Sequence, residues 1–410
     1  MRLYFSGIGG VGIGPLAMIA ADCGWQVLGS DVHSSDMVTE LINKGVNPFV
    51  GPQDGTYLKS VCESGNVDYF IYSSSLSNDH PELLLAQELN IKTIKRDQLI
   101  NLVIESKNLD MVAIAGTHGK TTTTAMIVWL ITKLNLAVSY SIGSTISFGY
   151  SGSYQPGSKF FIYEADEYDK NFLNFRPALS LITNVDYDHP DIYPTRESYI
   201  AAFEQFKDQS DKVIGPLEDN DIIPGIRLNG FHNRYNASLA IKAVQSIYTE
   251  FDLGELIEYI DEFPGTGRRM EKLAKNVYSD YAHTPEELAA TMQMLSEMFD
   301  TEKITVVYQP HQNKRQQNIM DTGGYKDSLD LASEIYWLPT YLTRGEVEST
   351  VKTEALIENL YNSGIAKSAE MNDILLKDLA KDYRDGSVIV FFGAGSIDAW
   401  ARQNLNQIVA

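Results

Sequence analysis

The residues best suited to chemistry follow the apolar run Met111–Ala115. Glycine lacks a Cβ and tolerates tight turns, so the backbone N–H groups between Gly116 and Gly119 can approach phosphate oxygens closely. Lys120 adds a positive charge, and the Thr121 hydroxyl is suited to contact Mg²⁺. Only two residues separate the glycines, so this loop is shorter than the GxxxxGK[ST] loop of many nucleotide hydrolases. The pattern predicts a nucleoside triphosphate site made of Gly116, Thr117, His118, Gly119, Lys120, Thr121 and Thr122.

Two acidic stretches supply candidate ligands for a magnesium ion. They follow the strand-like runs Phe160–Glu164 and Leu179–Thr183. Ligands of an open parallel sheet bind beyond the carboxyl ends of its strands, so both stretches should meet the phosphate loop at one edge. Mg²⁺ takes oxygen ligands and needs only one or two carboxylates beside a triphosphate. We expect Glu167 and His189 to complete the site, and a hydrogen bond to phosphate is the alternative for the imidazole. Other acidic residues could replace or support them, namely Asp166, Asp169 and Asp188.

A second glycine-rich turn, Gly7–Gly12, lies between a strand-like run and a helix-like run near the N-terminus. The strand Trp25–Asp31 follows, so the pattern predicts a βαβ unit whose turn either holds a diphosphate or simply brings helix and strand into close contact. A nicotinamide or flavin dinucleotide is the obvious ligand, but one such fingerprint does not identify it. Asp31 either binds a sugar hydroxyl or is simply an acidic residue at a loop, and Ser73–Ser75 bring hydroxyls to the end of another expected strand, Val67–Tyr72.

Polar clusters also follow four strands expected in the last third of the chain, at Val277–Asp280, Lys303–Tyr308, Glu334–Leu338 and Val388–Phe392. Each strand ends in a polar or glycine-rich stretch: Asp280–His283, Gln309–Arg315, Tyr341–Arg344 and Gly393–Gly395. Four such stretches at the carboxyl ends of one sheet indicate a further binding site. Upstream, Asn233 and Asn236 lie on the first turns of an expected helix; capping is the preferred explanation, and reading adenine is the alternative.

Length and composition limit the classes of protein. At 410 residues the chain should form two to four domains, and a polar turn at Glu105–Asp110 and a hinge-like stretch at Phe263–Arg269 mark two boundaries. A net charge of −21 argues against nucleic acid and anionic membranes as partners. Cys23 and Cys62 indicate neither a disulfide framework nor a thiolate metal site, so we expect a reducing, cytoplasmic location. Glycines interrupt the apolar run Leu3–Ala21, so we expect neither a secretion signal nor a membrane span.

The order of these pieces resembles the Mur ligase family, the ATP-dependent amide ligases of peptidoglycan precursor synthesis. The matching stretches span nearly the whole chain in collinear order: Gly7–Gly12, Gly29–Asp31, Gly116–Thr121, Glu164–Glu167, Thr183-Asn184 with Asp188-His189, His232-Asn233 with Asn236, Gly265–Arg269, Asp280-Tyr281 with His283, Gln309–His311 and Gly393–Gly395. The resemblance implies an α/β fold of three consecutive domains: a Rossmann-like UDP-sugar domain at 1–107, a central P-loop ATPase-like domain at 108–264, and a Rossmann-like amino-acid-binding and closing domain at 265–410.

The resemblance also implies a reaction and the residues that perform it. An amino acid would be joined to the carboxylate of UDP-N-acetylmuramate through an acyl phosphate, with ATP and Mg²⁺ as cofactors. The UDP-sugar would contact Gly9, Gly10, Val11, Gly12, Ser30, Asp31 and Ser74. Catalysis would depend on Lys120, Glu167, His189 and His283, and the metal would be held by Thr121, Glu167 and His189. Further ATP contacts would come from Asn233, Asn236, Arg268, Arg269 and Asp280, and the amino acid would lie against Tyr281, His283, Gln312 and Arg315.

Several alternatives stay open at this point. L-Alanine is the expected amino acid, but Gln312 and Thr284 stand where the family usually has arginine and histidine, which bears on this choice. A ligase for glycine or serine, and one that recycles an intact tripeptide, share the chemistry. From other classes, a noncatalytic nucleotide-binding regulator remains, and a nicotinamide oxidoreductase would leave Gly116–Thr121 unexplained. The resemblance fits a monomer or a homodimer.

Overall fold

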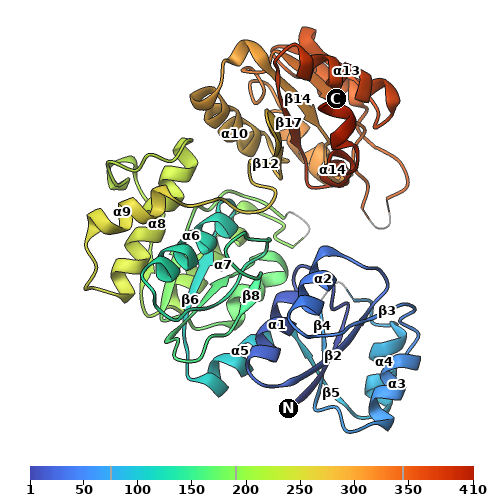
Figure 1. The fold of residues 1–410 in the computed structure, drawn as a ribbon, viewed down its shortest axis with the longest axis vertical. Helices are drawn as coiled ribbons and strands as arrows, with labels where there is room; N and C mark the ends of the chain where they lie inside the picture. Colours follow the sequence, from blue (N-terminus) through green and yellow to red (C-terminus); the bar gives the residue numbers. More distant parts are fainter. Residues whose placement is uncertain (74–75, 190–191, 344–345) are drawn as a thin grey trace. The chain divides into compact units, whose positions relative to one another are not determined.

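The computed structural model describes residues 1–73, 76–189, 192–343 and 346–410 (Figure 1). The chain divides into two compact units, each described by itself. The first comprises residues 1–226 and 236–264, and the second comprises residues 227–235 and 265–410. Two sheets belong to the first unit and one to the second. The α/β fold class is confirmed.

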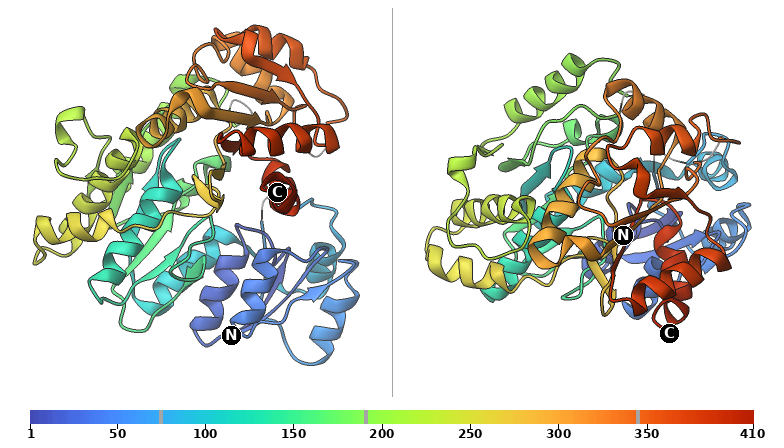
Figure 2. Two further views of the ribbon diagram at one scale, coloured as in Figure 1. Left: turned by 45° about the horizontal axis from the view of Figure 1, so that its top comes forward. Right: turned by 90° about the horizontal axis from the view of Figure 1, so that it is seen from above.

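The N-terminal sheet is parallel, in the strand order β3-β2-β1-β4-β5. Its strands are β1 (Arg2–Ser6), β2 (Gln26–Asp31), β3 (Phe49–Val50), β4 (Tyr69–Tyr72) and β5 (Lys92–Lys95). Helices cover both faces (Figure 2). One face packs on α1 (Gly14–Asp22), α2 (Asp36–Asn43) and α5 (Arg96–Lys107), and the other on α3 (Thr56–Glu63) and α4 (Pro81–Glu88). The expected βαβ unit is therefore present.

The central sheet has the order β11-β10-β6-β9-β7-β8, and only the β7–β8 pair is antiparallel. Its strands are β6 (Asp110–Ala115), β7 (Ser139–Ser141), β8 (Gly152–Ser153), β9 (Phe160–Glu164), β10 (Leu179–Ile182) and β11 (Val213–Ile214). The helices along this part of the chain are α6 (Lys120–Lys133), η1 (Tyr168–Asn174), α7 (Arg196–Asp208), η2 (Asp219–Asp221), α8 (Phe231–Ile247) and α9 (Leu253–Asp261). Because β6 lies between β9 and β10, the phosphate loop and both acidic stretches leave the sheet at the same edge, as the sequence predicts.

The sheet of the second unit has the order β12-β13-β17-β14-β15-β16, with β12 antiparallel. Its strands are β12 (Glu271–Ala274), β13 (Val277–Asp280), β14 (Ile304–Tyr308), β15 (Glu334–Trp337), β16 (Ala366–Ser368) and β17 (Val388–Phe392). The helices are α10 (Pro285–Met298), η3 (Thr301–Lys303), α11 (Asn313–Thr322), α12 (Thr353–Glu358), η4 (Ser363–Ile365), α13 (Asp373–Arg384) and α14 (Ile397–Ile408). The four expected strands are confirmed, and they are neighbours in the sheet.

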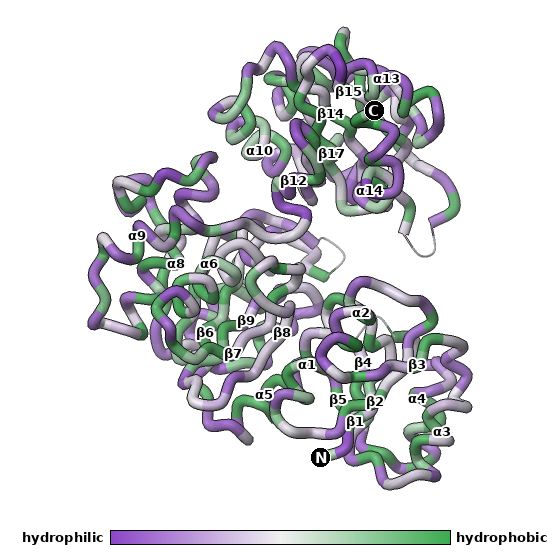
Figure 3. Tube along the Cα trace, viewed as in Figure 1, coloured by the Kyte–Doolittle hydropathy of each residue, from purple (hydrophilic) through white to green (hydrophobic). Residues whose placement is uncertain are grey.

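Apolar residues concentrate in the strands of all three sheets (Figure 3). Within the first unit one buried cluster is continuous from the N-terminal sheet to the central one, because it includes Leu3 of β1, Ala113 of β6 and Phe203 of α7. The two halves also touch at Gly152, where an added Cβ would lie 2.2 Å from the carbonyl oxygen of Pro15. The described part of the chain contains no helix long and apolar enough to span a bilayer.

Candidate active site

The phosphate loop between β6 and α6 depends on two glycines that no other residue could replace without displacement. Gly116 has φ +138° and Gly119 has φ +81°. A Cβ on Gly116 would lie 2.0 Å from the hydroxyl oxygen of Thr183, and one on Gly119 would lie 2.6 Å from Oδ1 of Asn236. Neighbouring side chains therefore press directly on the loop. The expected strand, loop and helix are confirmed here.

Side chains that follow β10 hold this loop from one side. The backbone N–H of His118 donates to Oδ1 of Asn184 at 2.9 Å, and the Thr183 hydroxyl donates to the His118 carbonyl at 2.6 Å. In the same loop, the Thr117 hydroxyl lies 2.9 Å from the hydroxyl of Tyr199 on α7. The loop is thus fixed by hydrogen bonds before any nucleotide binds, which is how a phosphate site is pre-organised.

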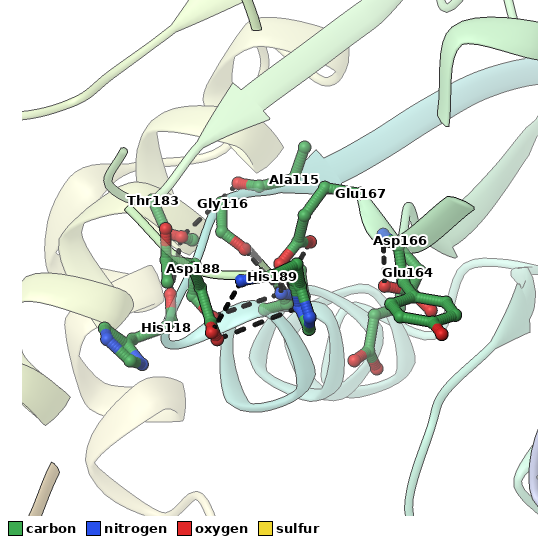
Figure 4. Close-up of polar contacts among 12 residues, drawn as sticks. Ala115, Gly116, His118, Glu164, Asp166, Glu167, Thr183, Asp188 and His189 are labelled. Carbon is green, nitrogen blue, oxygen red and sulfur yellow. Dashed lines mark hydrogen bonds and ion pairs between the residues drawn. The ribbon is translucent and has the colours of Figure 1, made fainter. Parts of the chain in front are cut away.

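Glu167 and His189 lie together beside Gly116 of the loop (Figure 4), and Lys120 contacts the same carboxylate. The Lys120 ammonium lies 2.8 Å from Oε2 of Glu167, and Nε2 of His189 lies 3.5 Å from Oε1 of the same carboxylate. The Glu167 side chain is only 1% exposed. Burial alone would lower the pKa of Lys120, but Glu167 and Asp166 raise it, so the ammonium stays charged. The charged Lys120 is thus fixed in the phosphate loop by its ion pair with Glu167.

A second carboxylate contacts the start of α6, and the sequence reasoning did not assign it a role. Oε1 of Glu164 accepts the Thr121 hydroxyl proton at 2.7 Å, and Oε2 accepts from the N–H of Gly143 at 2.9 Å. Thr121 therefore faces Glu164, whereas Glu167 faces Lys120. The signal was available, because Glu164 is the last residue of a strand that ends beside the phosphate loop.

The donors present fit a magnesium ion. Thr121, Glu164 and Glu167 offer hydroxyl and carboxylate oxygens beside the loop, and Mg²⁺ bound to a nucleotide takes only one or two protein carboxylates and fills its other positions with phosphate oxygens and water. Among the described residues, no group of three or more His, Cys, Asp or Glu side chains is arranged to hold a metal by itself.

His189 is oriented by its neighbours. Its backbone has φ +56°, and its N–H donates to Oδ1 of Asp188 at 2.8 Å. Its ring lies edge-on to Tyr168, with 5.2 Å between ring centroids. Below it, the Tyr193 hydroxyl donates to the Glu167 carbonyl at 2.6 Å. The acidic stretch after β9 and the stretch after β10 are thus tied together. Asp169, the remaining candidate ligand, is exposed.

The turn after β1 is tethered by a residue that was expected to bind sugar. Oδ2 of Asp31 accepts the N–H of Gly9 at 2.8 Å, so this carboxylate holds the turn in place. Gly10 is exposed, and Val11 at the tip is 69% exposed. Gly12 lies at the base of the turn, two residues before α1.

Ser30, another expected sugar contact, is fully buried. Its hydroxyl donates to the carboxylate of Glu82 at 2.7 Å, and the Ser6 hydroxyl donates to the same carboxylate at 2.6 Å. Glu82 thus joins the carboxyl ends of β1 and β2. The Ser30 carbonyl accepts the N–H groups of Gly7 and Ile8 at the start of the turn. Ser74 lies outside the described residues.

In the second unit, Asp280 and the paired arginines surround the end of β13. Asp280 is 5% exposed and accepts the backbone N–H groups of Met270 at 2.7 Å and Ala282 at 2.8 Å. Burial raises the pKa of this carboxyl. The Tyr281 ring lies 4.7 Å from the guanidinium of Arg268 and 5.2 Å from that of Arg269. Both arginines thus lie against the same aromatic ring.

Two histidines of the second unit lie close together beyond β13 and β14. The His283 ring is 5.9 Å from that of His311, and its Nδ1 lies 3.1 Å from Oε2 of Glu287. His311 stacks on Tyr341 with an interplanar angle of 10°. The sequence reasoning named His283 but gave His311 no role, although Gln309-Pro-His311 follows a strand.

The other expected residues of the amino-acid pocket lie on α11 or just before it. Gln312 precedes the helix with φ +62°, and Arg315 lies on its first turn, half-buried.

Asn233 belongs to the second unit, where its amide donates to the Asn229 carbonyl at 2.9 Å. Asn236 belongs to the first unit and packs on Gly119. Asn233 therefore bonds to the backbone just before α8, whereas Asn236 contacts the phosphate loop.

Comparisons with known proteins agree with this architecture. The model described as "Mur ligase family, catalytic domain" matches residues 2–107, "Mur ligase middle domain" matches 114–223, and "Mur ligase, glutamate ligase domain" matches 268–395. The UDP-N-acetylmuramate–L-alanine ligase of Pediococcus pentosaceus is 30% identical, with 96% of this chain and 96% of that protein covered. The chain belongs to the Mur ligase family. The corresponding ligase of Thermotoga neapolitana is 27% identical, with 98% and 96% covered.

Solved structures extend the likeness of this Mur ligase to three dimensions. The crystal structure of UDP-N-acetylmuramate-alanine ligase from Thermotoga maritima has a TM-score of 0.79 and 26% identity, with 99% of both chains covered. A murein peptide ligase from Psychrobacter arcticus has a TM-score of 0.64 and 21% identity, with 100% of this chain and 98% of that chain covered, and it supports the fold alone. Because the chain belongs to the Mur ligase family, the nicotinamide oxidoreductase alternative is not favoured.

Proposed function

We propose that this chain is an ATP-dependent amide ligase that joins L-alanine to the carboxylate of UDP-N-acetylmuramate and releases ADP and phosphate. The observation that carries the proposal is the contact of Lys120 and His189 with the buried Glu167 at a pre-organised phosphate loop. The named alanine ligases, similar over nearly the full length, supply the substrate.

The chemistry needs two steps. First, an oxygen of the sugar's carboxylate attacks the γ-phosphorus of ATP, the bond to the β–γ bridging oxygen breaks, and ADP leaves with that electron pair. Next, the amine of the amino acid attacks the carbonyl carbon of the acyl phosphate. The tetrahedral intermediate collapses, phosphate leaves, and the amine loses a proton. Both steps gather negative charge on clustered oxygens, which Lys120 and the N–H groups of the phosphate loop can stabilise.

Mg²⁺ would be held by Thr121 together with Glu164 and Glu167, with His189 as a further ligand or as a donor to phosphate. Bound there, the ion would neutralise charge on the phosphate oxygens. The protein's own task is to keep these groups fixed and to exclude water, since water would hydrolyse an acyl phosphate.

The three domains would divide the work. Residues 1–107 would bind the UDP-sugar at Gly9–Gly12, and residues 108–264 would bind ATP. Residues 265–410 would bring Asp280 and one of Arg268 and Arg269 to the ribose or phosphates, and would hold the amino acid near Tyr281, His283, Gln312 and Arg315. We propose a cytoplasmic location, where ATP is available.

One assay tests the function. The purified protein is given MgATP and UDP-N-acetylmuramate with single amino acids or the tripeptide, and phosphate release is recorded. We expect the highest kcat/KM with L-alanine and lower values with glycine and L-serine. A clear preference for the tripeptide would replace this proposal with the recycling reaction. No release with any acceptor, despite ATP binding, would favour a noncatalytic regulator.

A further inference from the structure

Arg96 occupies an unusual place in the first unit. It is the first residue of α5, where the positive end of the helix dipole disfavours a cation. Its side chain is only 21% exposed. The helix dipole does not stabilise a cation at this end, so neighbouring groups must stabilise the Arg96 guanidinium.

The guanidinium reaches two parts of the proposed active site. Nη2 donates to Oδ2 of Asp166 at 3.0 Å. Nη1 lies so close to Gly12 that a Cβ there would be 3.2 Å from it. Asp166 directly precedes Glu167, the carboxylate that pairs with Lys120. Arg96 therefore lies between the turn after β1 and the acidic stretch after β9.

The ion pair of Arg96 and Asp166 is partly buried, because the Arg96 side chain is 21% exposed and the Asp166 side chain 36% exposed. Among the described residues, the guanidinium makes one hydrogen bond, to Asp166. A guanidinium has five N–H donors in a planar fork, so the edge at Gly12 can serve a second anion.

We propose that Arg96 is a substrate-positioning residue that binds an anionic group of the sugar nucleotide while Asp166 holds the other edge of its guanidinium. The inference rests on the proposed function, since it takes the turn at Gly9–Gly12 as the sugar-nucleotide site. The anion is either the diphosphate or the carboxylate that reacts. Both are oxyanions that a guanidinium can bind with two parallel hydrogen bonds.

Binding measurements without turnover test this. Arg96→Ala and Arg96→Lys are compared with the wild type by calorimetry, using UDP-N-acetylmuramate, UDP-N-acetylglucosamine and ATP separately. Arg96→Ala should weaken UDP-N-acetylmuramate about tenfold or more, and Arg96→Lys should weaken it less, because lysine keeps the charge and loses the fork. Arg196→Ala is the matched control, since Arg196 also begins a helix, α7, but is exposed. It should bind like the wild type.

UDP-N-acetylglucosamine has the same diphosphate and lacks the carboxylate, so it separates the two anions. Equal weakening of both sugar nucleotides identifies the diphosphate, and weakening of UDP-N-acetylmuramate alone identifies the carboxylate. Unchanged binding of both overturns the proposal. An equal loss of ATP affinity also overturns it, because Arg96 would then act only by holding the acidic stretch.

Two further controls keep the result interpretable. If Arg96→Ala does not fold, by its thermal unfolding curve, Arg96→Lys and Arg96→Gln carry the test. Phosphate release by the wild type is measured in parallel. A wild type that binds the sugar nucleotide through Arg96 without releasing phosphate would sink the proposed function and leave this inference standing.

Discussion

The Lys120 ammonium and the Glu167 carboxylate form an ion pair of 2.8 Å in which the carboxylate is almost fully buried. Removing either partner of a buried ion pair is strongly destabilising, because it leaves an uncompensated charge in the protein interior. The pair also holds the lysine beside the carbonyls of Gly116 and Thr117, at the centre of the phosphate loop.

Lys120→Met should abolish turnover and destabilise the first unit by about 3–5 kcal/mol, because it removes the ammonium that neutralises the buried Glu167 carboxylate. Glu167→Gln should be less damaging, and the double variant should be more stable than the sum of both losses implies. Denaturant unfolding without ligand measures this coupling. Strictly additive losses would contradict the pairing, and phosphate release confirms that all three variants are inactive.

Thr121→Val removes the hydroxyl that donates a hydrogen bond to Glu164 and preserves the shape of the side chain. We expect it to raise the Mg²⁺ concentration needed for half-maximal turnover by about 10–100-fold. Thr121→Ser keeps the hydroxyl and should stay near the wild type. Titration of phosphate release with Mg²⁺, after chelation of bound metal, provides the measurement. If valine and serine behave alike, the hydroxyl has no part in the metal site.

Gly116→Ala should destabilise the first unit through both conformation and contact. The left-handed backbone alone costs about 1–3 kcal/mol for a residue with a Cβ, and the approach to Thr183 adds to this. Gly157→Ala is the matched control, since it has φ +90° and nothing within 4 Å of the added Cβ. Thermal unfolding should rank wild type, Gly157→Ala and Gly116→Ala in falling order; a reversed order of the two variants would show that the loop can move aside.

His311 should make the second unit sensitive to acid. Burial, with help from His283 and Arg315, lowers the pKa of its imidazole to about 4. An unfolded histidine has a pKa of about 6.5, so between about pH 6.5 and pH 4 the unfolded state binds more protons than the folded state. Stability from this group is present above pH 6.5 and falls as the pH drops through that range, by at most about 1.4 kcal/mol per pH unit.

The check is a comparison of unfolding curves at pH 7 and pH 5 for the wild type and His311→Gln. The glutamine variant should lose less stability on acidification, because one titrating group is gone. His232, whose pKa burial also lowers to about 4, remains in both proteins and serves as a common background. Identical acid sensitivity of the two proteins would show that His311 is not the group responsible.

Much of the fold could be predicted because its signals are local. The strand, glycine loop and helix at Asp110–Lys133 appear in the sequence as an apolar run, two glycines and a helical pattern. The strands β13 and β17 of the second unit have the predicted bounds. Short edge strands such as β8 and β16 were missed, since two or three residues carry no periodicity.

The candidate site was harder to predict where contacts join distant segments. No local pattern pairs Arg96 with Asp166, which lie 70 residues apart in the sequence, or places Asn236 against Gly119. The type of a residue also did not predict which group it contacts. Asp31 and Ser30 look like sugar ligands, yet one tethers Gly9 and the other is buried against Glu82.

The continuous core beneath the first two sheets has a thermodynamic consequence. Although three family models divide the chain, Leu3 of β1 and Phe203 of α7 belong to one buried cluster, and Gly152 leaves no gap against Pro15. Neither half could melt without exposing the apolar surface of the other. Calorimetry should therefore show residues 1–226 and 236–264 losing their structure in a single cooperative step.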